Sequence, residues 1–376
     1  MGIRSITLCA LLAVLFAVMY SCIEPFSPPE VNSDENYLVI DGFLNVGNDT
    51  SKIELRHSQN VNQNKAPIIE TGAKLTVEQE TGEKYEFIES GGGLYSLPPR
   101  QYNMAGKYRL RVKTKDGQEY LSEYVTVSVT PVIDSLTYKL DAGQNAMVFY
   151  VNTHDAQGKT QFYRWKFEET WEYRSAYGTY LEVINEQVVT RTQDINRCWA
   201  NKNSGSILLG STVKLTSDVI KNLPLNIVPV STNKLYIKYS ILVKQYGLSR
   251  PAFEYWTSLS KTTQGTGSLF DPQPSQVTGN IYNTTDSKKL AFGYFSASTQ
   301  ETKRITITPN LGTYPRCFAP DTLPIVCPPR SSDCATKTPQ LLLSYYGMRS
   351  DSVLTAPASC ADCRTEGGTT NRPSFW

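Results

Sequence analysis

The residues with the most evident chemistry in this 376-residue chain are its eight cysteines. Cys9 lies inside an apolar segment, and Cys22 follows the end of that segment. The other six are an even number, which in an exported protein favours disulfide bonds. We predict that these six form disulfides, whose pairing the sequence leaves open: Cys198, Cys317, Cys327, Cys334, Cys360 and Cys363.

A metal site is the alternative for the segment Cys360-Ala361-Asp362-Cys363, because two cysteines at this spacing can hold zinc or exchange thiols. The chain has no second cysteine pair at this spacing, and neither His57 nor His154 lies near the segment in sequence. We therefore expect structural disulfides, no metal and no cofactor.

Patterns typical of enzymes are scarce. The chain contains no Gly-x-Ser-x-Gly, no His-Glu-x-x-His and no phosphate-binding glycine loop. His57 ends an alternating segment and His154 adjoins a polar turn, both typical of surface positions. Glu168-Glu169 is a weak hint of the paired carboxylates that glycosidases use. We predict that the protein is not an enzyme, with a glycan-acting enzyme as an alternative.

The N-terminus reads as a secretory leader. A short basic start is followed by an apolar segment from about residue 6 to 19, and then by Cys22. That segment is too short to span a bilayer comfortably, and lipid attachment after signal cleavage explains the cysteine behind it. We predict a signal peptide over residues 1–21, a lipid on Cys22 and an extended, proline- and acid-rich linker over residues 22–36. An ordinary secretory signal is the alternative.

Strand patterns dominate the chain after the linker. Apolar and polar residues alternate over residues 53–56, 74–78 and 108–113, and Asp116-Gly117 is a strong hairpin signal. Turn residues recur about every ten positions, which is typical of a small antiparallel sandwich. We predict an immunoglobulin- or transthyretin-like β-sandwich over residues 37–131 that can fold alone.

A second, larger β-rich domain is predicted over residues 132–376. Ser249 is placed to cap a helix through Leu259, and residues 217–222 suggest one or two helical turns. Prolines and cysteines dominate from Pro315 onward, so we expect a C-terminal tail held by disulfides. The predicted class is all-β, with one or two short helices.

One aromatic segment is a candidate binding loop. Trp171, Tyr173, Tyr177 and Tyr180 surround Gly178 and could grip a sugar or a peptide. Packing against a neighbouring sheet is the alternative. The formal net charge is only +2, so we expect no nucleic-acid partner.

Several segments in a fixed order resemble a known family. They are Cys198-Trp199 and residues 267–274, 279–283, 293–298, 360–364 and 373–376. This order resembles the Bacteroidetes outer-membrane lipoprotein family catalogued as domain of unknown function 4249. The resemblance implies an outer-membrane lipoprotein, often encoded beside a TonB-dependent receptor, and it implies no established reaction.

The leading functional hypothesis combines the anchor with the resemblance. We expect a lipoprotein held in the outer membrane through Cys22, exposed at the cell surface, that binds a TonB-dependent transporter as an accessory partner. A periplasmic orientation is the alternative. A structural or assembly component of an envelope complex, or an adhesin, remains a second functional hypothesis beside the glycan-acting enzyme.

Overall fold

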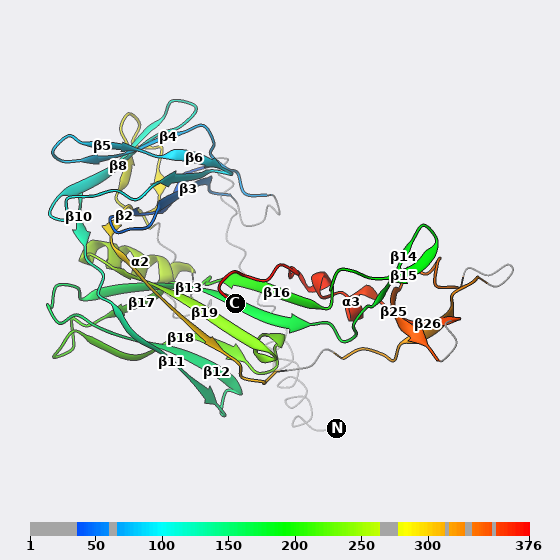
Figure 1. Ribbon diagram of the computed structural model, residues 1–376. Helices are drawn as coiled ribbons and strands as arrows, with labels where there is room; N and C mark the ends of the chain where they lie inside the picture. Colours follow the sequence, from blue (N-terminus) through cyan, green and yellow to red (C-terminus); the bar gives the residue numbers. More distant parts are fainter. Residues whose placement is uncertain (1–35, 60–65, 264–276, 313–315, 328–332, 348–350) are drawn as a thin grey trace, which may run out of the picture.

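Alternating strands near the N-terminus build the first of two β-sandwiches in the computed structural model, which describes residues 36–59, 66–263, 277–312, 316–327, 333–347 and 351–376 (Figure 1). One sheet has the order β21-β1-β3-β7-β6, spanning Ala291–Phe292, Leu38–Gly42, Ser51–His57, Leu94–Leu97 and Ile88–Gly91. The other has the order β2-β22-β10-β8-β4-β5, spanning Leu44–Asn45, Ala297–Ser298, Val125–Ser128, Lys107–Lys113, Lys74–Gln79 and Lys84–Glu86. Beside β8 lie β9 (Glu119–Ser122) and then β20 (Ile281–Asn283).

The predicted period-two pattern sets the core of this sandwich. In β8, Tyr108, Leu110 and Val112 are buried while the residues between them are more exposed. Asp116-Gly117 forms the turn between β8 and β9, and Gly117 has a φ of 87°, which glycine adopts without strain. The hairpin predicted at this position is confirmed.

Three short strands from much later in the chain complete the first sandwich. β21 runs parallel to β1, β22 lies between β2 and β10, and β20 pairs with β9. Phe295, between β21 and β22, is buried in the same core. Residues 37–131, predicted as a sandwich that can fold alone, end between β10 and β11 and form only part of this sandwich in the structure.

A buried carboxylate ties three strands of the first sandwich together. Glu78 on β4 is 4% exposed and lies 2.7 Å from Arg109 Nη2 and 2.9 Å from Arg111 Nε on β8. Lys84 Nζ on β5 lies 3.3 Å away. Burial alone would raise the pKa of Glu78, but hydrogen bonds from Arg111, Arg109 and Lys84 outweigh it and lower the pKa to about 2.

We expect Glu78→Gln to lower the free energy of unfolding by about 2 kcal/mol near neutral pH, because it leaves the half-buried guanidinium groups of Arg109 and Arg111 without the carboxylate that they share. The folded-state pKa of about 2 lies below the ordinary value of 4.5. The stabilisation is therefore fully present above pH 4.5 and is lost as the pH falls toward 2. Urea unfolding should show the difference between the two proteins shrinking over that range. A difference that stays constant would contradict the prediction, and Glu80→Gln, an exposed neighbour, should change little.

The second sandwich packs a three-stranded sheet against a larger one. The three-stranded sheet has the order β11-β12-β18, spanning Ile133–Asp141, Ala146–His154 and Val219–Pro229. The larger sheet has the order β16-β13-β19-β23, with β17 beside β13. These strands span Arg197–Asn203, Phe162–Arg174, Lys238–Gly247, Gln300–Ile307 and Leu208–Ser211. Its core includes fully buried Trp165, whose Nε1 donates to Gln245 Oε1 at 2.8 Å.

One helix of 14 residues sits where the two sandwiches meet (Figure 1). The predicted helix is confirmed as α2 (Arg250–Thr263), whose first turn bonds back to Ser249. Its buried side packs against β13 and β19 and against Phe43 and Tyr294 of the first sandwich. The helical turns predicted at residues 217–222 are wrong, because β18 begins there and pairs with β12. Within the described residues, no helix is both long and apolar enough to cross a membrane.

A hairpin from the middle of the chain and a sheet close to its C-terminus form an arm that projects away from both sandwiches (Figure 1). We define the arm as the hairpin β14-β15, the sheet β24-β26-β25 and the short helix α3. These elements span Leu181–Ile184, Gln187–Thr190, Asp321–Pro324, Ser352–Ala356, Leu341–Tyr346 and Ala358–Ala361. A small core of its own, including Leu181, Leu342 and Val353, holds the arm together. The all-β class with short helices is therefore confirmed.

Candidate functional site

All six predicted disulfide cysteines are paired, and the pairing explains how the arm is held. Cys198–Cys363 fixes the root of the arm to β16, at a sequence separation of 165 residues. Cys317–Cys360 and Cys327–Cys334 close shorter loops within the arm. Among the described residues, no group of three or more His, Cys, Asp or Glu side chains is placed to hold a metal ion.

The predicted aromatic loop is mostly not a loop. Trp171 and Tyr173 belong to β13, which continues to Arg174 because β16 and β19 pair along it. Tyr173 is buried, and its hydroxyl donates to the carbonyl of Cys363 at 2.7 Å. Tyr177 is half-buried, and its hydroxyl donates to the carbonyl of Phe318 at 2.8 Å. Only Tyr180 stays open to solvent, so the four residues do not form one binding surface.

The arm instead carries exposed apolar side chains, both near its β14-β15 hairpin and near its C-terminal sheet. Phe318 is 96% exposed and Val326 is 80% exposed, values unusual for side chains of this size. In the described part of the arm, the other exposed large apolar residues are Tyr180, Val183, Ile184, Tyr345 and Tyr346. A groove of about 540 Å³ runs between the β14-β15 turn and the C-terminal sheet, with Val188, Val326 and Tyr345 in its lining. Sequence alone does not separate these side chains from core residues.

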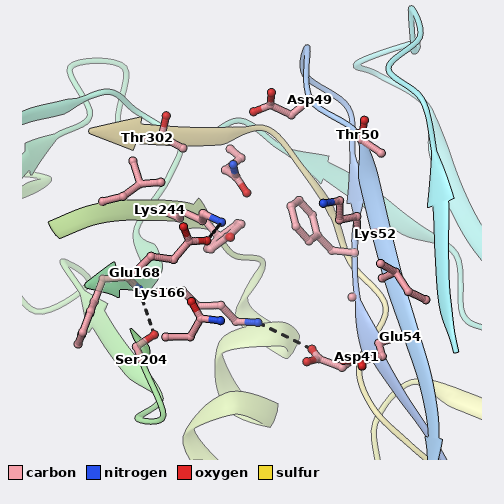
Figure 2. Close-up of a pocket in the computed structure, with 18 residues that line it drawn as sticks. Asp41, Asp49, Thr50, Lys52, Glu54, Lys166, Glu168, Ser204, Lys244 and Thr302 are labelled. Atoms are coloured by element: carbon pink, nitrogen blue, oxygen red, sulfur yellow. Dashed lines mark hydrogen bonds and ion pairs between the residues drawn. The ribbon is translucent and has the colours of Figure 1, made fainter. Parts of the chain in front are cut away.

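A second feature is the cleft between the two sandwiches. It has a volume of about 750 Å³, and Figure 2 shows side chains from both sides converging on it. The first sandwich contributes mainly β1 and β3, and the second contributes the outer face of β13, β19 and β23. Glu168, singled out in the sequence, lies in this cleft, whereas its neighbour Glu169 is buried against Tyr239 and Lys234.

Each wall of the cleft carries a like-charged pair on neighbouring strands. Asp41 on β1 is directly opposite Glu54 on β3. Lys166 on β13 is directly opposite Lys244 on β19. Like charges placed directly across a sheet destabilise it. The two walls are complementary, and Lys166 Nζ reaches Asp41 Oδ1 across the cleft at 3.9 Å (Figure 2).

Partial burial disfavours the positive charges of the second wall, although the Lys166 side chain is still 41% exposed. This burial lowers the pKa of Lys166, and the nearby charges of Arg164 and Lys244 lower it further, although Asp41 partly offsets them. Burial also lowers the pKa of Arg164 to about 10. The Arg164 guanidinium carbon lies 3.4 Å from the centre of the Trp256 ring, a cation–π contact. In the described part of the chain, Arg164 has no ion pair.

Among the residues that the structure describes, the carboxylates and histidines do not assemble a recognisable catalytic set. In the cleft, Glu168 pairs with Lys244 and Glu54 with Arg56. His57 lies outside the cleft, 2.9 Å from Glu70. His154 is exposed, 2.8 Å from Asp134, whose hydrogen bond raises the pKa of the imidazole. Neither histidine reaches a nucleophile that an adjacent base could activate.

The structure thus defines a protein of two β-sandwiches with an interdomain cleft and a disulfide-stapled arm. The chain matches the family Domain of unknown function (DUF4249) over residues 23–304, and it belongs to this family. Strands β24, β25 and β26 of the arm lie beyond the matched residues. No curated protein matches the chain.

Two solved structures are similar to the chain over long stretches. A two-domain fibronectin type-III segment from chicken tenascin is 12% identical, with a TM-score of 0.17, and the match covers 56% of this chain and 91% of that one. The BSP domain of a biofilm associated protein is 8% identical, with a TM-score of 0.16, and the match covers 76% of this chain and 63% of that one.

Proposed function

We propose that this protein is a Bacteroidetes outer-membrane lipoprotein, anchored through Cys22 at the cell surface, whose arm binds a TonB-dependent transporter. The observation that carries the proposal is the set of exposed aromatic and aliphatic side chains on the arm. Large exposed apolar surfaces on soluble modules mark interaction sites. Tyrosine and phenylalanine are also enriched at the centres of protein interfaces.

The construction of the arm supports this role. Disulfides Cys317–Cys360 and Cys327–Cys334 restrict the arm around the exposed residues. A surface that is ordered before binding loses less conformational entropy on docking. A lipid anchor would raise the effective concentration of the arm near membrane partners. The identity of the partner as a transporter rests on association within the family, which is an analogy.

The anchor is tested first in the native cell envelope. Cys22→Ala should move the protein from the membrane pellet to the soluble fraction, because the thiol is the proposed point of lipid attachment. An unchanged distribution and an unchanged mass of the mature protein would contradict the anchor.

The partner is tested by extraction in mild detergent and native purification. The double variant Val326→Ser, Tyr346→Ser should recover at least about tenfold less transporter than the unaltered protein, as expected for truncating central interface side chains. Ile88→Ser is the matched control, because Ile88 is 66% exposed but lies on the first sandwich. Recovery of the unaltered protein without any transporter would refute the proposal. Equal recovery with all variants would refute the role of the arm.

A further inference from the structure

We propose that the cleft between the sandwiches binds a short zwitterionic peptide, whose ammonium end lies at Asp41 and Glu54 and whose carboxylate end lies at Lys166 and Lys244. This inference goes beyond the proposed function and does not depend on the arm. It would give the protein a small-ligand site as well as a partner surface.

The placement of charge is the first argument. Each wall places two like charges directly opposite each other on adjacent strands, an arrangement that costs stability. The acidic pair and the basic pair both line the cleft, in which the walls face each other (Figure 2). A ligand with one positive and one negative end adds an opposite charge to both pairs at once, beside Glu168, which already pairs with Lys244, and Arg56, which already pairs with Glu54.

The pairing already present in the cleft is incomplete, which is the second argument. The distance of 3.9 Å between Lys166 and Asp41 exceeds the roughly 2.7–2.9 Å of a charge-assisted hydrogen bond. Lys52 on β3 also lines the cleft and has no ion pair among the residues that the structure describes. Lys166 and Lys52 therefore keep capacity for a carboxylate and Asp41 for an ammonium group, whereas Lys244 and Glu54 already have a partner each in Glu168 and Arg56.

The size and the other lining groups fit a peptide. A volume of about 750 Å³ lies in the range of small-molecule sites. Asn203, Gln300 and Thr302 offer hydrogen-bonding groups for backbone amides, and Phe43 and Tyr246 offer apolar surface. A neutral sugar would shield the charged pairs from water without neutralising them, which costs free energy.

The two walls are held in place by a short hydrogen-bonded crossover. Thr130 N donates to Thr299 Oγ1 at 2.8 Å, and Gly247 N donates to Thr130 Oγ1 at 2.9 Å. Thr130 and Thr299 lie on the two chain segments that pass between the sandwiches, and Gly247 ends β19, which lines the cleft. The two bonds therefore tie both segments to the cleft wall. The cleft is thus preorganised, which reduces the entropic cost of binding.

Calorimetric titration of the purified full-length protein with tetra-alanine tests the inference. We expect saturable binding, and we expect blocking either end, by N-acetylation or by C-amidation, to weaken it at least about tenfold, since each block removes a charge-assisted contact. Absence of binding at up to about 10 mM peptide, or equal binding of the blocked and free peptides, would overturn the inference.

Two double variants test which wall of the cleft binds which end of the peptide. Asp41→Asn, Glu54→Gln should abolish the effect of N-acetylation and keep that of C-amidation, and Lys166→Gln, Lys244→Gln should do the reverse. Lys139→Gln, on exposed β11, is the control and should bind like the unaltered protein. Thermal unfolding checks that every variant is folded. An effect of N-acetylation that persists in the Asp41, Glu54 variant, an effect of C-amidation that persists in the Lys166, Lys244 variant, or loss of both effects in the control would overturn the assignment.

Discussion

A fragment covering residues 36–131 should show no cooperative unfolding transition, whereas the same fragment joined by a flexible linker to residues 277–299 should regain one. The reason is that the first sandwich lacks three of its strands without the later segment. β2 pairs with β22, and β1 loses its edge partner β21. The core also loses Ile281, Phe295 and Ala297. Circular dichroism during urea titration measures the transition.

A single substitution tests the same dependence in the whole protein. Phe295 is 1% exposed, and both its backbone N–H and its carbonyl are bonded by the Asn280 side chain at 2.8 and 2.9 Å. Phe295→Ala should therefore cost about 3–5 kcal/mol of unfolding free energy. Ile88→Ala, at an exposed position of the same sandwich, is the control. A cooperative transition in the fragment of residues 36–131 would show that the later strands are dispensable.

The parts of the fold that sequence predicts are those with strong local signals. β8 alternates over seven residues, Asp116-Gly117 favours a tight turn, and Ser249 precedes a helix with a regular apolar side. Strands β21 and β22 have only two residues each, too short for any period to show. Their place is set by pairing with strands far away in the chain, which a local pattern does not contain.

The candidate site was less predictable for the same reason. Asp41 and Lys166 meet across the cleft only because the two sandwiches are packed around α2, and nothing near either residue indicates the other. The predicted binding loop around Gly178 includes Trp171 and Tyr173, but in the structure β16 extends the pairing of β13 past both residues. The exposed residues of the arm, such as Val326, look like core residues until the fold is known.

The disulfide that roots the arm should make the largest contribution among the three cross-links. Replacing it, in Cys198→Ser, Cys363→Ser, should lower the free energy of unfolding by up to about 5 kcal/mol, because it closes a loop of 165 residues in the unfolded chain. It also supports the contact of Cys363 with Tyr173, so the C-terminal segment should become more accessible to protease. Urea unfolding and limited proteolysis measure the two effects.

The matched control is the pair Cys327→Ser, Cys334→Ser, which opens a loop with a sequence separation of only 7 residues. The chain-entropy account predicts a cost of about 2–3 kcal/mol there. The two costs should differ by roughly 2 kcal/mol, and the control should leave the root of the arm protected, since Trp199 N still bonds the Thr369 carbonyl at 2.8 Å. Equal costs, or proteolysis that begins within the β14-β15 hairpin in both variants, would mean that the arm is held by packing rather than by the Cys198–Cys363 bond.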